Sequence, residues 1–120
     1  MKLPKVTTMR TKCDRLLTPI IKKLHPYCLL CGHSTEVAHH HVHKSKSTRL
    51  RYELDNLINL CTMCHLKLHH NESFWASKIV EIKGIEWFKR IAKLGQKTVK
   101  ADVHYYIQNY ERLKKLTVDN

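Results

Sequence analysis

The sequence contains no apolar run that approaches the roughly 20 residues that a membrane-spanning helix needs. Its first residues, Met1 to Lys5, lead into no apolar signal segment, so no secretion signal is visible. No internal repeat or low-complexity linker interrupts the chain, and 120 residues suit one domain with one hydrophobic core. These absences predict a soluble, cytoplasmic protein in which residues 1–120 form a single domain.

Acidic residues are scarce, because ten Asp and Glu face 22 Lys and Arg and leave a formal net charge of +12. The excess is uneven: residues 1–51 carry eleven basic and two acidic side chains, whereas residues 52–120 carry eleven and eight. We therefore expect the first part of the chain to face phosphate groups. Charge alone names no partner, so a general solubilising role stays open at this point.

The cysteines favour a metal site over disulfides. Their count of five is odd, no secretion signal accompanies them, and four of them form two Cys-x-x-Cys pairs. Each pair can present two thiolates to one tetrahedral metal ion. The sequence therefore predicts a structural zinc ion bound by Cys28, Cys31, Cys61 and Cys64. Cys13 lies outside both pairs, and we expect it to be a small core residue, with a surface thiol as the alternative.

Local patterns in the first part of the chain predict short elements. Thr18 followed by Pro19 is typical of a helix start, which predicts a short helix over about residues 19–24. The segment around Val37, over about 35–43, is expected to form a strand that pairs in a hairpin. Thr62 suits the N-cap of a helix that runs to about residue 70.

The remainder, about residues 73–117, is predicted to be helical, which gives an α+β protein overall. Apolar residues recur there at helical spacing in three stripes, which we expect to be buried in the core and to carry no chemistry. The stripes are Phe74, Trp75, Ile79 and Ile82; Ile85, Phe88, Ile91 and Ala92; and Val103, Tyr106, Ile107, Tyr110, Leu113 and Leu116.

Histidine is concentrated in the middle of the chain, where seven of the ten lie between positions 39 and 70. The first cluster contains His39 to His41 and His43, and the second contains His65, His69 and His70. Because His65 and His69 are four residues apart on the expected helix, they share one face and can offer two imidazoles to a metal. A zinc ion at the start of this helix would hold it against the strand, so a second metal site between the two clusters is expected.

These residues together resemble a known family motif. The run Cys28-x-x-Cys31, His39-His40, Asp55-Asn56-Leu57 and Leu60-Cys61-x-x-Cys64-His65 resembles the HNH, or ββα-metal, nucleases. The resemblance implies a zinc-stapled hairpin and helix over about 28–70, surrounded by further helices. Lys12 to Leu16, Leu50 to Tyr52 and Phe74-Trp75 further resemble phage recombination endonucleases of the NinG (Rap) type.

The same resemblance implies a role for each motif residue. His40 would be the general base, His39 and His65 would bind the catalytic metal, and Asn56 would orient the loop and the base. His69 as a third metal ligand resembles the colicin-type nucleases. A register shifted by one, with His40 as a ligand and His41 as the base, stays open.

The implied activity is metal-dependent hydrolysis of DNA phosphodiester bonds, with Lys44, Lys46, Arg49 and Arg51 gripping the backbone beside the cut. The catalytic cation is expected to be Mn²⁺, Ni²⁺, Co²⁺ or Mg²⁺, with magnesium the least suited because the motif offers no nearby carboxylate. The partner is expected to be DNA, branched or nicked, and two-strand cutting would call for a homodimer or two successive nicks. Alternatives are a zinc-stabilised, non-catalytic DNA-binding module and a structural zinc protein that binds other proteins.

Overall fold

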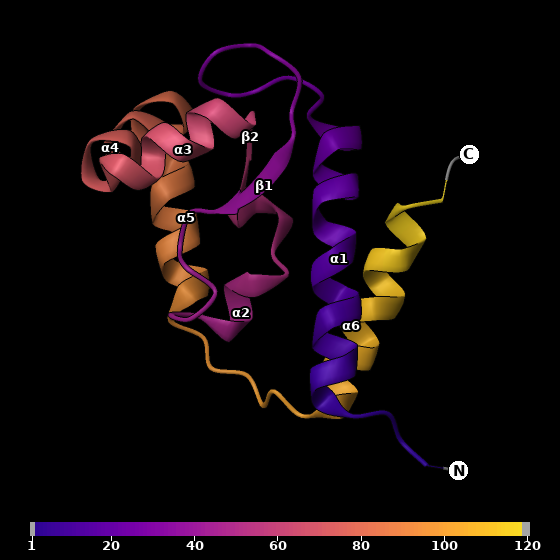
Figure 1. Ribbon diagram of the computed structural model, residues 1–120. Coiled ribbons are helices and arrows are strands. Elements are labelled where there is room, and N and C mark those ends of the chain that lie inside the picture. Colours follow the sequence, from indigo (N-terminus) through magenta and orange to yellow (C-terminus); the bar gives the residue numbers. More distant parts are fainter. Residues whose placement is uncertain (1, 119–120) are drawn as a thin grey trace.

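The computed structural model describes residues 2–118 and confirms the α+β class, with six α-helices and one two-stranded sheet in that range (Figure 1). The helices are α1 (Val6–Leu24), α2 (Thr48–Arg51), α3 (Thr62–His70), α4 (Glu72–Lys83), α5 (Ile85–Gly95) and α6 (Val103–Leu116). The strands are β1 (Val37–His40) and β2 (Leu57–Leu60), and a short 3₁₀ turn, η1 (Leu54–Asn56), precedes β2. None of the helices within residues 2–118 combines the length and the apolar character that crossing a membrane requires.

The two strands form an antiparallel hairpin that lies between two helices. Val37 pairs with Leu60 and His40 pairs with Leu57, so β1 is shorter than the strand predicted over 35–43. Helix α1 packs against the hairpin on one side and α3 against β1 on the other (Figure 1). Because successive side chains of a strand point to opposite faces, neighbouring histidines of β1 are directed toward different helices.

Helix α1 contradicts the prediction of a short helix over 19–24, because it starts at Val6 and runs through Pro19. A proline inside a helix removes one backbone hydrogen bond and costs about 3 kcal/mol. Helix α1 nevertheless continues because it buries Leu17 and Ile20 on either side of this position. Tertiary burial thus outweighs the local signal of Thr18 and Pro19.

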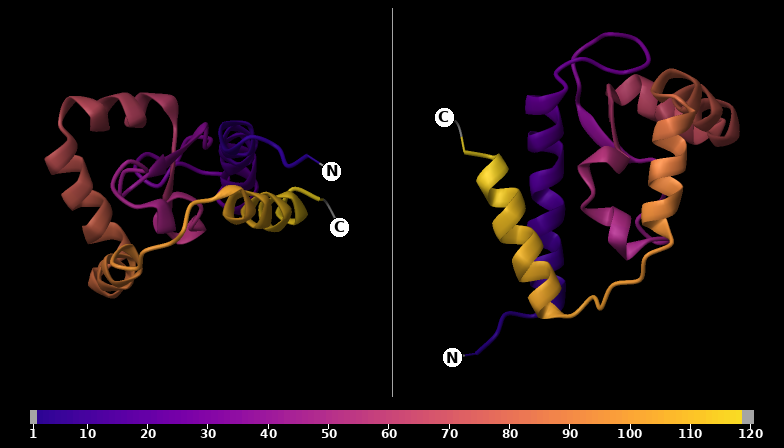
Figure 2. Two further views of the ribbon diagram at one scale, coloured as in Figure 1. Left: turned by 90° about the horizontal axis from the view of Figure 1, so that it is seen from below. Right: turned by 180° about the vertical axis from the view of Figure 1, so that it is seen from behind.

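The two terminal helices, α1 and α6, lie side by side in both views of Figure 2 and share a core. Met9 and Cys13 of α1 are buried against Tyr106 and Leu113 of α6. The Cys13 thiol donates to the Tyr106 carbonyl at 3.3 Å, and burial, followed by the charge of neighbouring Asp14, raises its pKa to about 11. Cys13 is therefore an unreactive core thiol, which confirms the prediction.

Two shorter elements begin differently from the sequence prediction. The N-cap of α3 is Cys61, whose Sγ accepts the Cys64 N–H at 3.4 Å, so the prediction of Thr62 was wrong. Residues 44–49 are polar and basic, which predicts a loop, but the last two of them belong to α2, whose N-cap Ser47 accepts the Leu50 N–H on its hydroxyl at 3.2 Å. In both caps the side chain accepts from a backbone N–H three positions later, which single-residue propensities do not distinguish.

The apolar stripes of α4, α5 and α6 are only partly buried, so their assignment to the core was partly wrong. Ile79, Ile91, Tyr106 and Leu113 are buried. Trp87, which was not predicted, is also buried. These helices cover the core from outside, so each stripe has an exposed edge. The exposed members are Phe74, Ile82, Ile85, Phe88, Ala92 and Leu116.

Candidate metal centres and nucleic-acid surface

The four cysteines predicted to bind zinc meet in one cluster, in which all four Sγ atoms lie within 4.8 Å of one another. Cys28 and Cys31 belong to the turn between α1 and β1, where Gly32 adopts φ +80° and donates its N–H to the Cys28 carbonyl at 2.9 Å. That left-handed conformation strains any residue with a side chain, which explains the glycine. Cys61 and Cys64 come from the start of α3. The turn and the helix together therefore provide four ligands.

The environment of these thiols suits a bound cation. Burial raises the pKa of Cys28, but hydrogen bonds from the backbone of Cys61, Cys31 and Leu30 outweigh burial and lower it to about 7. Burial, together with the neighbouring sulfurs, raises the pKa of Cys64. A divalent cation stabilises adjacent thiolates that would otherwise repel one another. Four sulfur donors fit a closed, tetrahedral structural zinc site.

Three of the predicted histidine ligands gather between β1 and α3. The ring centroid of His39 lies 5.3 Å from that of His65 and 6.3 Å from that of His69. The Nε2 atoms of His65 and His69 are 3.1 Å apart. Within residues 2–118, only the cysteines bring three or more ligand atoms within 4.8 Å of one another, so this histidine cluster is the more open of the two.

Two imidazoles of the cluster, those of His39 and His65, are held in the neutral form that metals require. His39 is only 7% exposed, and burial, followed by the neighbouring His65 and His43, lowers its pKa to about 3. Burial and the adjacent His69 also lower the pKa of His65. Neutral nitrogens packed this closely leave their lone pairs available to a cation.

A carboxylate lies beside the histidine cluster, contrary to the expectation that none would be near. Glu72, the first residue of α4, is hydrogen-bonded to Nε2 of His43, and the His43 ring centroid is 6.3 Å from that of His39. The hydrogen bond with His43 lowers the pKa of Glu72. Sequence analysis missed Glu72 because its position depends on the change of direction at Asn71, where α3 ends and α4 begins.

His40 and His41 lie outside the cluster that His39 forms with His65 and His69. His40 is the last residue of β1, and its Nε2 lies 2.9 Å from the Arg51 carbonyl. A carbonyl only accepts, so Nε2 carries the hydrogen and Nδ1 carries the lone pair of the neutral ring. Burial lowers the pKa of His40, although the Arg51 carbonyl opposes this. The His41 ring lies 4.9 Å from that of Trp87.

Asn56 is fully buried and fastens the loop that follows β1. Its Oδ1 accepts the Val42 N–H at 2.9 Å, and its Nδ2 donates to the carbonyls of Val42 at 3.1 Å and Leu50 at 3.3 Å. One side chain thus satisfies three backbone groups that belong to both ends of the loop. This loop carries His43 and leads to the carbonyl that holds His40.

The four basic residues predicted to contact DNA occupy three different environments. Lys44 and Lys46 are exposed, whereas Arg49 is half-buried and lies 3.5 Å from Glu53. Arg51 forms a two-pronged ion pair with Asp14, at 3.0 and 2.6 Å, and its side chain is only 15% exposed. A guanidinium held in this way supports the fold and has fewer donors left for a phosphate.

No protein-family model, no curated protein and no solved structure matches this chain. The chemistry is therefore inferred from the two clusters. The cysteine cluster offers four sulfur donors, which suit a structural ion. The histidine cluster offers neutral imidazoles and a nearby carboxylate, which suit a cation that also binds a substrate.

Proposed function

We propose that this chain is a metal-dependent endonuclease of the HNH (ββα-metal) type that hydrolyses DNA phosphodiester bonds. The observation that carries the proposal is the gathering of His39, His65 and His69 between a strand and a helix. His40 ends the same strand, and β1, β2 and α3 follow one another in the order implied by the family resemblance. A zinc ion bound by the four cysteines would anchor the start of α3 and hold its two histidines against β1.

The proposed chemistry assigns a separate task to each group. His39, His65 and His69 would hold a divalent cation, which would supply Lewis-acid polarisation of the scissile phosphate and positive charge beside the departing 3′ oxygen. Nδ1 of His40 accepts a proton from the attacking water, since Nε2 is bonded to the Arg51 carbonyl. Asn56 holds the loop that carries this arrangement. The family resemblance implies 5′-phosphate and 3′-hydroxyl products.

The register with His39 as the ligand and His40 as the base is the one that the geometry favours. His39 has the short ring distances to His65 and His69, whereas His40 is bonded to a backbone carbonyl. Adjacent residues of a regular strand point to opposite faces of the sheet. Both can reach one phosphate only where the regular strand ends at this pair. Strand β1 does end at His40.

The histidine ligands favour transition metals, and the nearby carboxylate of Glu72 changes what is expected of magnesium. Imidazole suits Mn²⁺, Co²⁺ and Ni²⁺, whereas Mg²⁺ prefers oxygen. Glu72 adds an oxygen donor at the edge of the cluster through His43, so magnesium supports more activity than histidines alone would allow. We expect robust cleavage with manganese, cobalt or nickel, weaker cleavage with magnesium, and inhibition by excess zinc.

The proposed substrate is DNA, gripped beside the cut by Lys44, Lys46 and Arg49. These residues follow the histidine-rich strand directly, and the first two are exposed. The resemblance to phage recombination endonucleases points to branched DNA, and cutting both strands would require a homodimer or two nicks. A role in DNA recombination, and a cytoplasmic location in the host cell, belong to this proposal.

A cleavage assay with added metal tests the proposal. Supercoiled plasmid and a four-way junction are incubated with the protein and each divalent cation in turn, beside His69→Ala. Metal-dependent nicking is expected, and His69→Ala should weaken metal affinity more than the maximal rate, because His69 is one ligand of several. A zinc-containing protein that binds both DNAs and cuts neither with any cation would instead establish the non-catalytic DNA-binding module.

A further inference from the structure

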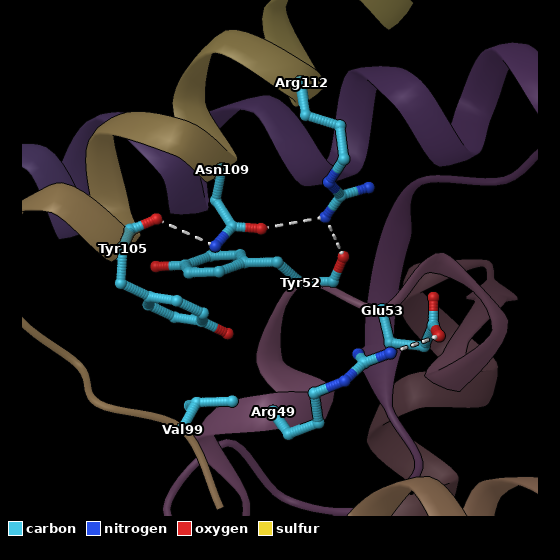
Figure 3. A pocket seen from close by; sticks show the side chains of 7 residues that line it. All are labelled: Arg49, Tyr52, Glu53, Val99, Tyr105, Asn109 and Arg112. Atoms are coloured by element: carbon cyan, nitrogen blue, oxygen red, sulfur yellow. Dashed lines mark hydrogen bonds and ion pairs between the residues drawn. The ribbon is translucent and has the colours of Figure 1, made fainter.

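A polar cavity of about 390 Å³ lies away from both clusters, between α2 and α6. Its walls include Arg49 from α2, and Tyr105, Asn109 and Arg112 from α6, which surround one open space (Figure 3). No cysteine or histidine lines it. Cavities of this size are typical of ligand sites, and among its lining residues only Arg49 has a part in the function proposed above.

A second cavity of about 230 Å³ adjoins the first, because Arg49 and Val99 line both. Lys46 and Lys97 also line it, and Lys97 belongs to the segment that joins α5 to α6 and passes beneath α2 (Figure 1). The two adjoining cavities are together named the connector groove. Its charged residues are Lys46, Arg49, Glu53, Lys97 and Arg112.

The connector groove is positively charged. Lys46, Arg49, Lys97 and Arg112 contribute four positive charges against the single carboxylate of Glu53, a formal balance of +3. Glu53 is 3.5 Å from Arg49, in a pair of the i,i+4 kind between partly exposed side chains. Pairs of this kind are weak, so a phosphate oxygen can take the place of Glu53.

The guanidinium of Arg112 is fixed in position and has N–H donors available for an anion. Its Nη2 donates to the Tyr52 carbonyl at 2.6 Å and to Oδ1 of Asn109 at 3.0 Å (Figure 3). A guanidinium has five N–H donors, and within residues 2–118 neither Nη1 nor Nε of Arg112 donates to another residue. The Tyr105 hydroxyl is likewise fixed, because it donates to the Thr48 carbonyl at 3.2 Å. A fixed guanidinium with spare donors loses little freedom when it binds phosphate.

We infer that the connector groove binds the sugar-phosphate backbone of a DNA strand, with phosphates on Arg112 and Lys97, two residues to which the nuclease proposal gives no role. Two adjoining cavities with basic residues along both suit a polyanion more than a single small anion. The Lys44–Lys46 segment leads from the histidine-rich strand into the groove, so one strand can contact both. The inference rests on the proposed function only for the identity of the polyanion as DNA.

Salt-dependent binding of a fluorescein-labelled DNA duplex tests this inference, measured by anisotropy with the full chain and no added divalent cation. Each phosphate contact contributes about 0.9 to the slope of log affinity against log salt. Lys97→Gln should lower the slope by about 0.9 and weaken binding about eightfold near 0.1 M salt. The double variant with Arg112→Gln should lose about twice that slope. Thermal melting checks folding, and Lys97→Gln alone suffices if the double variant is unstable.

The matched control is the double variant Lys78→Gln and Lys89→Gln, which removes the same charge from exposed lysines on α4 and α5. Each of these lysines pairs weakly with a glutamate three residues away, at 3.6 and 3.9 Å. Equal loss of slope in the groove and control variants would overturn the inference.

Cleavage by the parent chain separates the two proposals. If the parent cuts DNA and Lys97→Gln binds as the parent does, the groove inference fails while the nuclease proposal stands. If only the groove variants lose slope and the parent never cuts, the groove stands without the nuclease. In a cutting enzyme, Lys97→Gln should raise the DNA concentration that gives half-maximal rate and leave the maximal rate unchanged, because Lys97 lies outside the reacting groups.

Discussion

Replacement of Asn56 by alanine should lower the free energy of unfolding by about 3 kcal/mol. The side chain is fully buried and makes three hydrogen bonds, to the N–H and C=O of Val42 and to the Leu50 carbonyl. A hydrogen bond contributes about 1 kcal/mol net, so three give about 3 kcal/mol. The loss is larger if water cannot reach the three abandoned groups, since each unsatisfied buried group costs about 1–3 kcal/mol. Against a total stability of about 5–15 kcal/mol, this is a large change.

The assay is equilibrium urea unfolding followed by circular dichroism, with Asn59→Ala as the control. Asn59 lies on β2 and is also buried, but it makes one side-chain hydrogen bond, to the Tyr27 carbonyl at 2.6 Å. Asn59→Ala should therefore cost only about 1 kcal/mol. Equal effects of the two substitutions, or a loss below 1 kcal/mol for Asn56→Ala, would refute the idea that Asn56 fastens the loop.

Three further predictions concern the zinc ligands, acid stability and the ion pair of Asp14. Cys64→Ser should lose zinc, and with it cooperative unfolding, because structural zinc supplies ~10 kcal/mol or more of folding free energy. Atomic absorption on the purified protein measures the zinc content, and a zinc-free variant that still unfolds cooperatively would contradict the prediction. The pKa of His39 is about 3 in the folded protein and about 6.5 in the unfolded chain. The contribution of neutral His39 to the free energy of unfolding is therefore complete above pH 6.5, and it falls by about 1.4 kcal/mol per pH unit as the pH drops toward 3. Urea titrations from pH 7 to 5 without added cation should show this slope of the free energy of unfolding against pH, and His39→Gln should reduce the slope. An unchanged slope in that variant would be the contrary result. Asp14→Asn should lower the free energy of unfolding by about 2 kcal/mol, a value discounted for partial exposure, because it leaves the Arg51 guanidinium without its carboxylate. Thermal melting measures this loss of stability, and no loss would mean that the pair does not stabilise the fold.

Features set by local spacing could be predicted from the sequence. The two Cys-x-x-Cys pairs form the cluster that their spacing predicted, and His65 and His69 share one face of a helix. The strand around Val37 and the helix that ends near residue 70 were predicted from local patterns, whereas the second strand was implied by the HNH resemblance. Cys13 was correctly assigned to the core because no second cysteine was placed to pair with it.

Features that depend on tertiary packing could not be predicted. Pro19 is a helix-start signal by itself, and only burial of the surrounding α1 residues against α6 and the hairpin makes it an interior residue. Arg51 looks like a phosphate contact until the fold brings Asp14 beside it, 37 positions away in sequence. Glu72 reaches the histidine cluster only because α4 starts directly after α3. Long-range proximity, rather than residue type, decides each of these cases.

The central claim is that His40 is the base of a DNA-cleaving site whose metal is held by His39, His65 and His69. Its most direct test is the initial rate of plasmid nicking with manganese for the parent, His40→Ala and His41→Ala, at matched zinc content and DNA affinity. General-base removal costs about 10²- to 10⁴-fold, so His40→Ala should lose at least about 100-fold, whereas His41→Ala, which lies against Trp87, should stay near the parent rate. A parent that does not nick, or a His40→Ala variant that nicks as fast as the parent, would contradict the claim.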